Sequence, residues 1–146
     1  MDVSVGVGVT DVPVGDGEAT VPGRPFRADD PLAPHDAYAS SKVEAERALA
    51  GIAAGTPLEA VVLRLPLVYG PRVKGNFATL LDAVAREALL PFGRVANRRD
   101  FLYVGNLVHA ITALVDLSDT RGGAWLVADG EAVATPELVR RLAAAL

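Results

Sequence analysis

An α/β fold built on a parallel sheet is predicted by three features of the sequence. Short apolar runs rich in β-branched residues alternate with longer segments in which apolar side chains recur at helical spacing. The run at 58–65, LEAVVLRL, is almost continuously apolar, as is typical of a strand covered on both faces. The alternation continues to the last residue without an internal repeat. Together these features predict a partial doubly wound sheet with crossover helices, forming a single partial domain over residues 1–146.

The first third of the chain is predicted to hold a strand, a long loop and a helix. Residues 3–9, VSVGVGV, have the β-branched content of a strand that glycines weaken. Five prolines and several glycines between 10 and 35 favour a loop, because these residues interrupt helices and strands alike. Helical spacing runs over 36–53, with Asp36 as the expected N-cap and Gly55 as the expected stop.

The middle of the chain is predicted to hold one strand and one helix. The strand at 58–65 should end at Pro66, which has no N–H for pairing, and LVYGPR after it is expected to be a loop. Residues 76–89 have helical spacing, and residues 91–100 are polar and irregular. The expected apolar set of this helix is Phe77, Leu80, Leu81, Val84 and Leu89.

The last part of the chain is predicted to repeat the alternation twice. Strands are expected at 101–104 and 124–129, and helices at 106–117 and 135–146. The last helix opens with Thr-Pro-Glu, in which Thr135 should cap the helix, proline suits the first turn and the acid complements the helix dipole.

The composition argues against several classes of function. Lys and Arg number 14 against 18 for Asp and Glu, without a basic stripe, so nucleic acid is not an expected partner. The absence of cysteine excludes disulfides and thiolate metal sites, and the two histidines do not form a metal-binding pair. No apolar run approaches the ~18 to 20 residues of a membrane helix, and the start lacks a basic signal-peptide region. A cytoplasmic protein is therefore expected.

The segment DAYASSKVEAE places Tyr38 and Lys42 four residues apart within the first predicted helix. Residues at this spacing lie on one helix face, a turn apart. A neighbouring ammonium group favours a phenolate, and the remaining lysine donors can bind a ligand hydroxyl. Such a pair can serve as an acid/base for interconverting a carbinol and a ketone. On these two letters alone, an ordinary tyrosine and a solvated lysine on a helix surface remain the alternative.

Further blocks of sequence follow in a fixed order along the chain. They are FRADDPLAPHDAYASSKVEAERAL, VVLRLPLVYGP, VKGNF, PFG, NRRDFLYVGNLVHAI and WLVADGEAVATPELVRRL. In this order they resemble the NAD-dependent epimerase/dehydratases, the extended branch of the short-chain dehydrogenase/reductase superfamily, and within it the sugar-nucleotide 4-epimerases. The resemblance covers essentially the whole chain and implies a Rossmann-like fold.

The resemblance implies a role for particular residues. Tyr38 would be the acid/base, and Lys42 would hold the nicotinamide ribose of NAD, with Pro66 also at the cofactor. A serine or threonine would bind the reacting oxygen, and Ser4 fits the local pattern better while Thr10 fits the spacing better. In an epimerase, a sugar C4 would lose its hydride to NAD⁺ while the tyrosine takes the hydroxyl proton, and the ketone would then be reduced again from its other face.

On the substrate side, the resemblance implies that Asn76 and Arg99 bind the diphosphate of a nucleotide sugar. The start of a helix suits a phosphate at Asn76, and a guanidinium suits bidentate binding at Arg99. The alternatives are a plain N-cap at Asn76 and a surface arginine at Arg99. Leu67 stands where many relatives have an asparagine, so the identity of the sugar nucleotide stays open. An exposed edge of the partial sheet predicts association or marginal stability, so a homodimer is a further expectation. NADP in place of NAD stays open.

The chain departs from the family at its cofactor turn. The family binds NAD through a glycine-rich turn after the first strand, but no G-x-x-G-x-x-G occurs in this sequence. GVGVTD at 6–11 and GDGEAT at 15–20 are incomplete versions. Two alternatives therefore stand beside an active epimerase or dehydratase. One is an inactive relic or a fragment that binds a nucleotide or a partner subunit, and the other is a reductase of a non-sugar ketone.

Overall fold

The computed structural model describes residues 25–34, 36–93, 95–117 and 122–146 of the chain. The predicted strand at 3–9 and most of the predicted loop at 10–35 lie outside these residues. The described elements, in chain order, are α1 (Ala37–Ala53), β1 (Val61–Arg64), β2 (Leu67–Tyr69), α2 (Gly75–Ala85), β3 (Phe101–Tyr103), α3 (Val104–Asp116), β4 (Gly123–Leu126) and α4 (Thr135–Ala145).

Two short parallel strand pairs organise these elements. β1 pairs in parallel with β4, with Leu63 opposite Trp125, and β2 pairs in parallel with β3, with Val68 opposite Leu102. Pro66 lies between β1 and β2, so the chain leaves one pair and enters the other there. The parallel pairing and the helical connections confirm the predicted α/β class.

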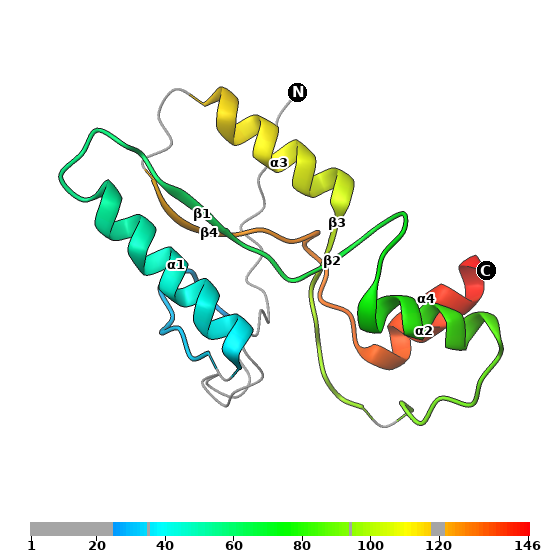
Figure 1. Cartoon of the computed structure of the whole chain (residues 1–146). Coiled ribbons are helices and arrows are strands. Elements are labelled where there is room, and N and C mark those ends of the chain that lie inside the picture. The colour runs from blue at the N-terminus through cyan, green and yellow to red at the C-terminus, as the bar shows by residue number, and fades with distance from the viewer. Residues whose placement is uncertain (1–24, 35, 94, 118–121) are drawn as a thin grey trace.

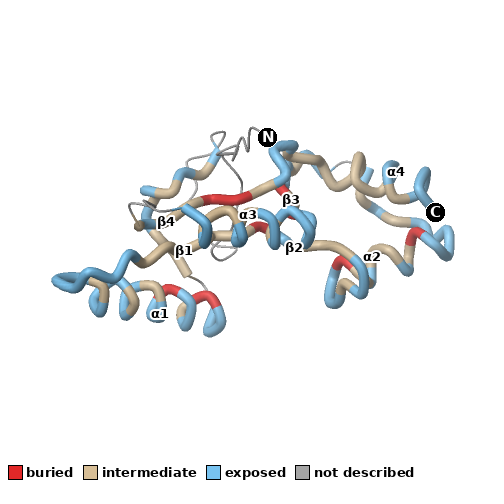
Figure 2. The backbone as a smooth tube through the Cα atoms, turned by 90° about the horizontal axis from the view of Figure 1, so that it is seen from above, coloured by how far each residue is buried: buried red, intermediate tan, exposed pale blue. Residues whose placement is uncertain are grey.

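The helices lie around these strands in two groups. The β1–β4 pair passes between α1 and α3, and α2 and α4 lie side by side beyond β2 and β3 (Figure 1). α1 runs back along β1, so its N-terminal end lies toward the end of the pair where β1 stops (Figures 1 and 2). In parallel α/β sheets, ligands bind outside the carboxyl ends of the strands, which is the end that the start of α1 faces.

Burial is shallow around α1 and deeper around β3. α1 buries only Ala39 and Val43, two small side chains. Leu102 of β3 is 1% exposed, and Phe77 of α2 and Leu126 of β4 are also buried. The core of the described part therefore lies under β3 and β4.

The start and end of α1 agree with the sequence. The Asp36 carboxylate accepts a hydrogen bond from the backbone N–H of Ala39, with a distance of 2.6 Å between Oδ1 and N. Aspartate is a preferred N-cap because it satisfies a free N–H of the first turn. At the other end, Gly55 has a φ of 78°, a left-handed conformation that glycine adopts at little cost after a helix. The predicted boundaries of this helix are confirmed.

The prediction of a loop over LVYGPR was wrong for its first half. Leu67–Tyr69 form β2, which pairs with β3 at a separation of more than 30 positions along the chain. Only three residues pair, and Gly70 follows with a φ of 156°. A Cβ at Gly70 would lie 2.5 Å from a methyl carbon of Val104, so glycine permits the close approach of the two segments. Local sequence does not carry this long-range pairing.

The predicted end of the helix at Leu89 was also wrong, because α2 ends at Ala85. Glu87 adopts a left-handed φ of 54°, its N–H donates to Val84, and the Ala88 N–H donates to Ala83. These two bonds form a Schellman motif, which usually contains glycine at the left-handed position. Here a glutamate takes that position, so the usual stop signal is absent from the sequence. Leu89 is consequently fully exposed.

The last helix begins where it was expected but is capped differently. Thr135 is its first residue, and no side chain within the helix caps it. Instead the backbone N–H and the hydroxyl of Thr135 both donate to Oδ1 of Asn97, at 3.0 and 2.9 Å. The predicted threonine cap was therefore wrong, since a residue 38 positions earlier supplies the acceptor. The remaining elements begin and end within three residues of their predicted bounds.

Candidate functional site

Tyr38 and Lys42 lie on one exposed face of α1, in its first two turns. Tyr38 is 72% exposed, and Nζ of Lys42 lies 5.3 Å from the centroid of the tyrosine ring. An ammonium group at this distance is attracted by the face of the ring. The predicted geometry of the pair is therefore confirmed, while its chemical role stays a prediction.

The first turn of α1 is held by local hydrogen bonds. Asp36 caps it, and the Ser41 hydroxyl donates to the carbonyl oxygen of Tyr38 at 2.7 Å. These bonds hold the backbone of Tyr38 in place, and neither of them involves the tyrosine hydroxyl. Its hydroxyl can therefore meet a ligand from the solvent side.

Pro66 and Asn76 stand at the two ends of the connection that contains β2. Pro66 is buried and lies two residues after Arg64, the last residue of β1. Asn76 is exposed and is the second residue of α2, which begins at Gly75 with Lys74 in the N-cap position. No side chain caps this helix, so Asn76 is not the plain N-cap that was the alternative reading. Its position in the first turn leaves backbone N–H groups available to an anion.

Arg99 is exposed on a segment that is fixed by backbone pairing. The backbone N–H of Arg99 donates to Val133 at 3.0 Å, and the Val133 N–H donates back at 2.8 Å, which makes an isolated antiparallel bridge. Within the described residues, the Arg99 side chain makes no hydrogen bond or ion pair. The guanidinium therefore has its donors available on a fixed stretch of backbone.

The structure does not join the two halves of the predicted site by direct contact. In the described part of the chain, no hydrogen bond or ion pair connects Tyr38 or Lys42 with Asn76 or Arg99. The third catalytic candidate, Ser4, lies outside the described residues, as does its alternative Thr10.

Asp129 connects several segments and was missed by the sequence analysis. Its carboxylate accepts from the Tyr69 hydroxyl at 3.0 Å, from the backbone N–H of Tyr103 at 3.0 Å and from the amide of Asn106 at 2.7 Å. It thus joins the end of β2, the start of α3 and the turn after β4. The only available signal was an aspartate before glycine after a strand, which usually indicates no more than a turn.

An aromatic cluster borders a cavity of about 570 Å³ beside Asp129. The ring centroids of Tyr69 and Phe77 are 5.7 Å apart, and those of Tyr69 and Tyr103 are also 5.7 Å apart. Burial raises the pKa of Tyr69, and its hydrogen bond to the Asp129 carboxylate raises that pKa further. The phenol is therefore kept neutral, as a donor to Asp129.

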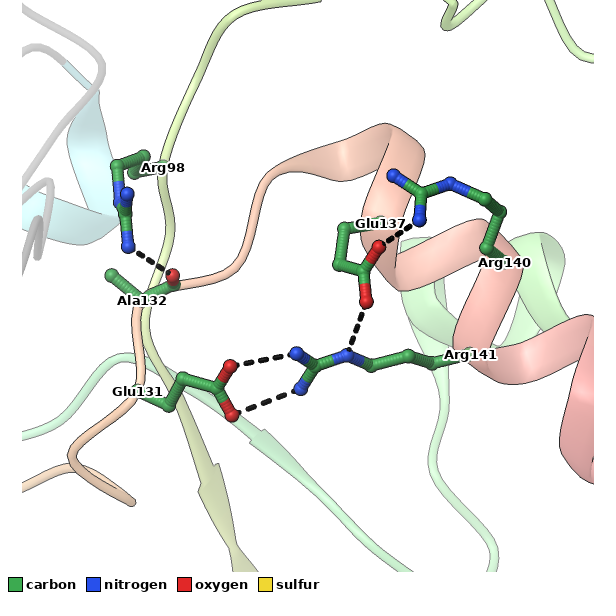
Figure 3. A network of polar contacts seen from close by, with 6 residues as sticks. All are labelled: Arg98, Glu131, Ala132, Glu137, Arg140 and Arg141. Atoms are coloured by element: carbon green, nitrogen blue, oxygen red, sulfur yellow. Dashed lines mark hydrogen bonds and ion pairs between the residues drawn. The ribbon is translucent and has the colours of Figure 1, made fainter.

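A network of exposed charges lies between α4 and the segment before it (Figure 3). Arg141 donates to both oxygens of Glu131, at 2.9 and 2.6 Å, and to Glu137 at 2.7 Å. Glu137 also pairs with Arg140, and Arg98 donates to the Ala132 carbonyl. The hydrogen bonds from Arg141 lower the pKa of both glutamates. Arg141 is thus already paired, which leaves Arg99 better suited to an anionic ligand.

The described residues also bear on metal binding and membrane insertion. No group of three or more His, Asp or Glu side chains among them is arranged to hold a metal ion. None of the described helices is both long and apolar enough to cross a membrane.

The class of protein to which this α/β chain belongs is shown by its similarity to a known family. The family described as "NAD dependent epimerase/dehydratase family" matches residues 7–128, and the chain belongs to this family. This confirms the resemblance drawn from the sequence blocks.

The chain is also similar to several named proteins. The chain is 43% identical over 131 residues to the UDP-glucose 4-epimerase of Vibrio cholerae, covering 89% of this chain and 40% of that protein. The structure is similar to UDP-glucose 4-epimerase of Thermus thermophilus in complex with NAD, with a TM-score of 0.70 and 26% identity, over 94% of this chain and 44% of that one. It is also similar to the Bordetella bronchiseptica enzyme WbmG in complex with NAD and UDP, with a TM-score of 0.66 and 28% identity, over 86% and 37%. The chain thus spans about two fifths of the length of these relatives.

Proposed function

We propose that the chain is a single partial domain that contributes the acid/base pair and the diphosphate site of an NAD-dependent sugar-nucleotide epimerase or dehydratase. The observation that carries this proposal is the exposed Tyr38–Lys42 pair at the start of α1 in a chain of this family. Both side chains reach solvent at the end of the β1–β4 pair where parallel α/β folds bind ligands.

Tyr38 is the proposed acid/base for a sugar hydroxyl. Its phenol would take the proton from the hydroxyl oxygen as the carbon becomes a ketone, and would return the proton in the reverse direction. Lys42, with its ammonium 5.3 Å from the tyrosine ring, would stabilise the phenolate electrostatically. General acid–base catalysis of this kind typically contributes about 10²- to 10⁴-fold in rate.

The residues that the structure describes fit one end of NAD. Lys42 has no ion pair within the described residues, so its donors are available to ribose hydroxyls beside Tyr38, and Pro66 is proposed to border the same end. When bound, NAD⁺ would supply the acceptor for a hydride from the sugar carbon. The incomplete glycine turns at 6–11 and 15–20 lie outside the described residues, so no residue is proposed for the pyrophosphate.

Asn76 and Arg99 are the proposed contacts of the substrate diphosphate. Asn76 stands in the uncapped first turn of α2, and the Arg99 guanidinium is unpaired on a fixed backbone segment within the described residues. The diphosphate of a nucleotide sugar would be attracted by both features. UDP-glucose is the first substrate to test, because the Vibrio cholerae and Thermus thermophilus relatives are UDP-glucose 4-epimerases.

The test is calorimetric titration of the chain with NAD⁺, with UDP-glucose and with both together, followed by an assay for UDP-galactose. Binding of both ligands and turnover that Tyr38→Phe reduces at least about 10²-fold would support the proposal. Binding of UDP-glucose alone would favour the alternative of a nucleotide-binding fragment. If neither ligand binds, the proposed function is wrong for this chain.

A matched pair of arginine variants tests the substrate class. Arg99→Ala should weaken UDP-glucose binding by about 1.5 to 3 kcal/mol, the range for a hydrogen bond to a charged group. Arg98→Ala, one residue earlier and bonded to the Ala132 carbonyl, should change binding little. Equal effects of the two variants would remove Arg99 from the site and favour the reductase of a non-sugar ketone. Light scattering of the same samples tests the expected homodimer.

A further inference from the structure

Arg64, the last residue of β1, connects three segments of the chain. Its Nε and Nη2 atoms donate to the two carboxylate oxygens of Glu46 on α1, at 3.2 and 2.5 Å. Its Nη1 atom donates to the carbonyl oxygen of Ala28, at 2.7 Å. The backbone oxygen of Arg64 accepts from Val127, which holds the residue against the segment after β4. One side chain therefore ties α1 and residues 25–34 to the sheet.

The pair is largely shielded from solvent, which makes it different from the surface network of Figure 3. The side chains of Arg64 and Glu46 are 12% and 22% exposed, whereas those of Arg141 and Glu131 are 48% and 63% exposed. A shielded pair is screened less by water and salt, so its geometry is held more strictly.

α1 has few other contacts that could fix its position on the sheet. Its buried side chains are Ala39 and Val43, which are small and offer little shape to resist sliding or rotation. Glu46 lies two turns after Tyr38 and one turn after Lys42, on the side of the helix next to Val43. The hydrogen bonds between Arg64 and Glu46 therefore control the rotation of α1 about its axis and its position along β1.

We propose that Arg64 is a positioning residue that acts through Glu46 to hold the Tyr38–Lys42 pair in place relative to the half of the molecule that carries Asn76 and Arg99. The proposal rests on the proposed function for the meaning of that placement. Within the described residues no hydrogen bond or ion pair joins the Tyr38–Lys42 pair to Asn76 or Arg99, so their relative placement depends on other contacts. Arg64 suits this role because it is two residues before Pro66, where the chain passes from one strand pair to the other.

The planar fork of arginine is required for this role. Two parallel N–H donors meet the two carboxylate oxygens while a third reaches Ala28, and a lysine ammonium cannot reproduce this arrangement. Arg64→Lys should thus retain the charge and lose the orientation, which makes it more informative than removal of the whole side chain.

The placement of α1 can be measured by electron paramagnetic resonance between two spin labels. The chain has no cysteine, so Ala45→Cys on α1 and Asp82→Cys on α2, both exposed, give a single labelled pair. In this background, Arg64→Lys and Glu46→Gln should shift the distance distribution or broaden it about twofold, as expected for an element released from its tie. Circular dichroism would show that both variants keep their helices.

Glu131→Gln is the matched control, since it breaks an arginine–carboxylate fork of the same chemistry on the surface. It should leave the label distance unchanged. An unchanged distance in Arg64→Lys and Glu46→Gln, with folding retained, would overturn the proposal. A loss of stability without a change in the label distance would also contradict the proposal, because the Arg64–Glu46 pair would then stabilise the fold without positioning α1. If Glu46→Gln does not fold, Arg64→Lys decides the result.

A second measurement links the placement to turnover of UDP-glucose. Arg64→Lys should lower kcat by about tenfold or more while KM changes less, because a small misplacement of a reacting group costs rate rather than binding at Asn76 and Arg99. A rise in KM with kcat unchanged would contradict the proposal. The spin-label measurement needs no ligand, so a failure of the proposed function and a failure of this inference give different results.

Discussion

The two ends of the described structure are held together in different ways. At one end, α1 lies on β1 through two small buried side chains and the Arg64–Glu46 pair. At the other end, β2 and β3 lie against α2 through a cluster of four aromatic rings, with Leu102 almost fully buried. The first end carries the proposed acid/base pair, and the second carries the proposed diphosphate contacts.

The contrast indicates which property a substitution should change at each end, the stability or the position of a helix. Apolar packing is non-directional, so its loss mainly lowers the free energy of unfolding. A hydrogen-bonded pair is directional, so its loss mainly changes the position of the segments that it joins. We therefore expect substitutions around β3 to unfold the chain and substitutions around α1 to change the position of α1 on the sheet. Four further predictions test this difference, from the largest expected effect to the smallest.

Leu102→Ala should have the largest effect on stability. Leu102 is 1% exposed in β3, and removing a buried leucine side chain leaves a cavity that costs about 3 kcal/mol. Urea unfolding followed by the fluorescence of Trp125 would measure the change. Leu89→Ala is the control, because Leu89 is fully exposed and its loss should cost less than about 0.5 kcal/mol. Equal costs for the two variants would contradict the assignment of the core.

Asp129→Ala should come next, at about 2 kcal/mol, because it leaves three donors without their acceptor. Burial and the Asp129 carboxylate both raise the pKa of Tyr69, so the variant should lower that pKa while leaving the effect of burial. The raised pKa stabilises the fold below about pH 10, and this contribution is lost as pH rises through the folded value. Absorbance titration of Tyr69 against a Tyr69→Phe blank measures the shift, and no shift would remove Asp129 from this role.

Asp36→Ala should cost about 1 kcal/mol, the usual loss for an N-cap. The effect should be local, because the cap holds only the first turn that carries Tyr38. Amide hydrogen exchange at Ala39 and its neighbours should accelerate while exchange in β3 stays unchanged. Asp36→Ser keeps a capping oxygen and should restore most of the protection. Faster exchange throughout the chain would show that the two ends are more strongly coupled than their contacts indicate.

Glu131→Gln should have the smallest effect, because the pair with Arg141 is exposed and exposed pairs contribute little. The hydrogen bond from Arg141 lowers the pKa of the Glu131 carboxyl in the folded chain. The pair therefore stabilises the fold above the ordinary glutamate pKa of about 4.3 and loses its effect as pH falls through the lower folded value. Thermal midpoints of both proteins should converge at low pH and in about 1 M salt. A difference that survives both conditions would require another role for Glu131.

The sequence predicted the first half of the candidate site better than the second. Tyr38 and Lys42 are four residues apart in one helix, so local geometry alone brings them together, and the cap at Asp36 is equally local. Arg99 and Asn76 were predicted by resemblance, and the position of Arg99 depends on its pairing with the distant Val133. The hydrogen bonds to Asp129 could not be predicted, because an aspartate before a glycine usually indicates only a turn.

The sequence by itself determined the alternation of strands and helices, the bounds of α1 and the face that carries Tyr38 and Lys42. Each of these follows from side-chain spacing and capping within a few residues of the chain. Only the tertiary structure decided that β2 is a strand, that α2 ends without a glycine, that Asn97 supplies the cap of α4 and that Arg64 ties α1 to the sheet. In three of these the partner lies 18 to 38 positions away, and in α2 a glutamate takes a backbone conformation that its type does not favour.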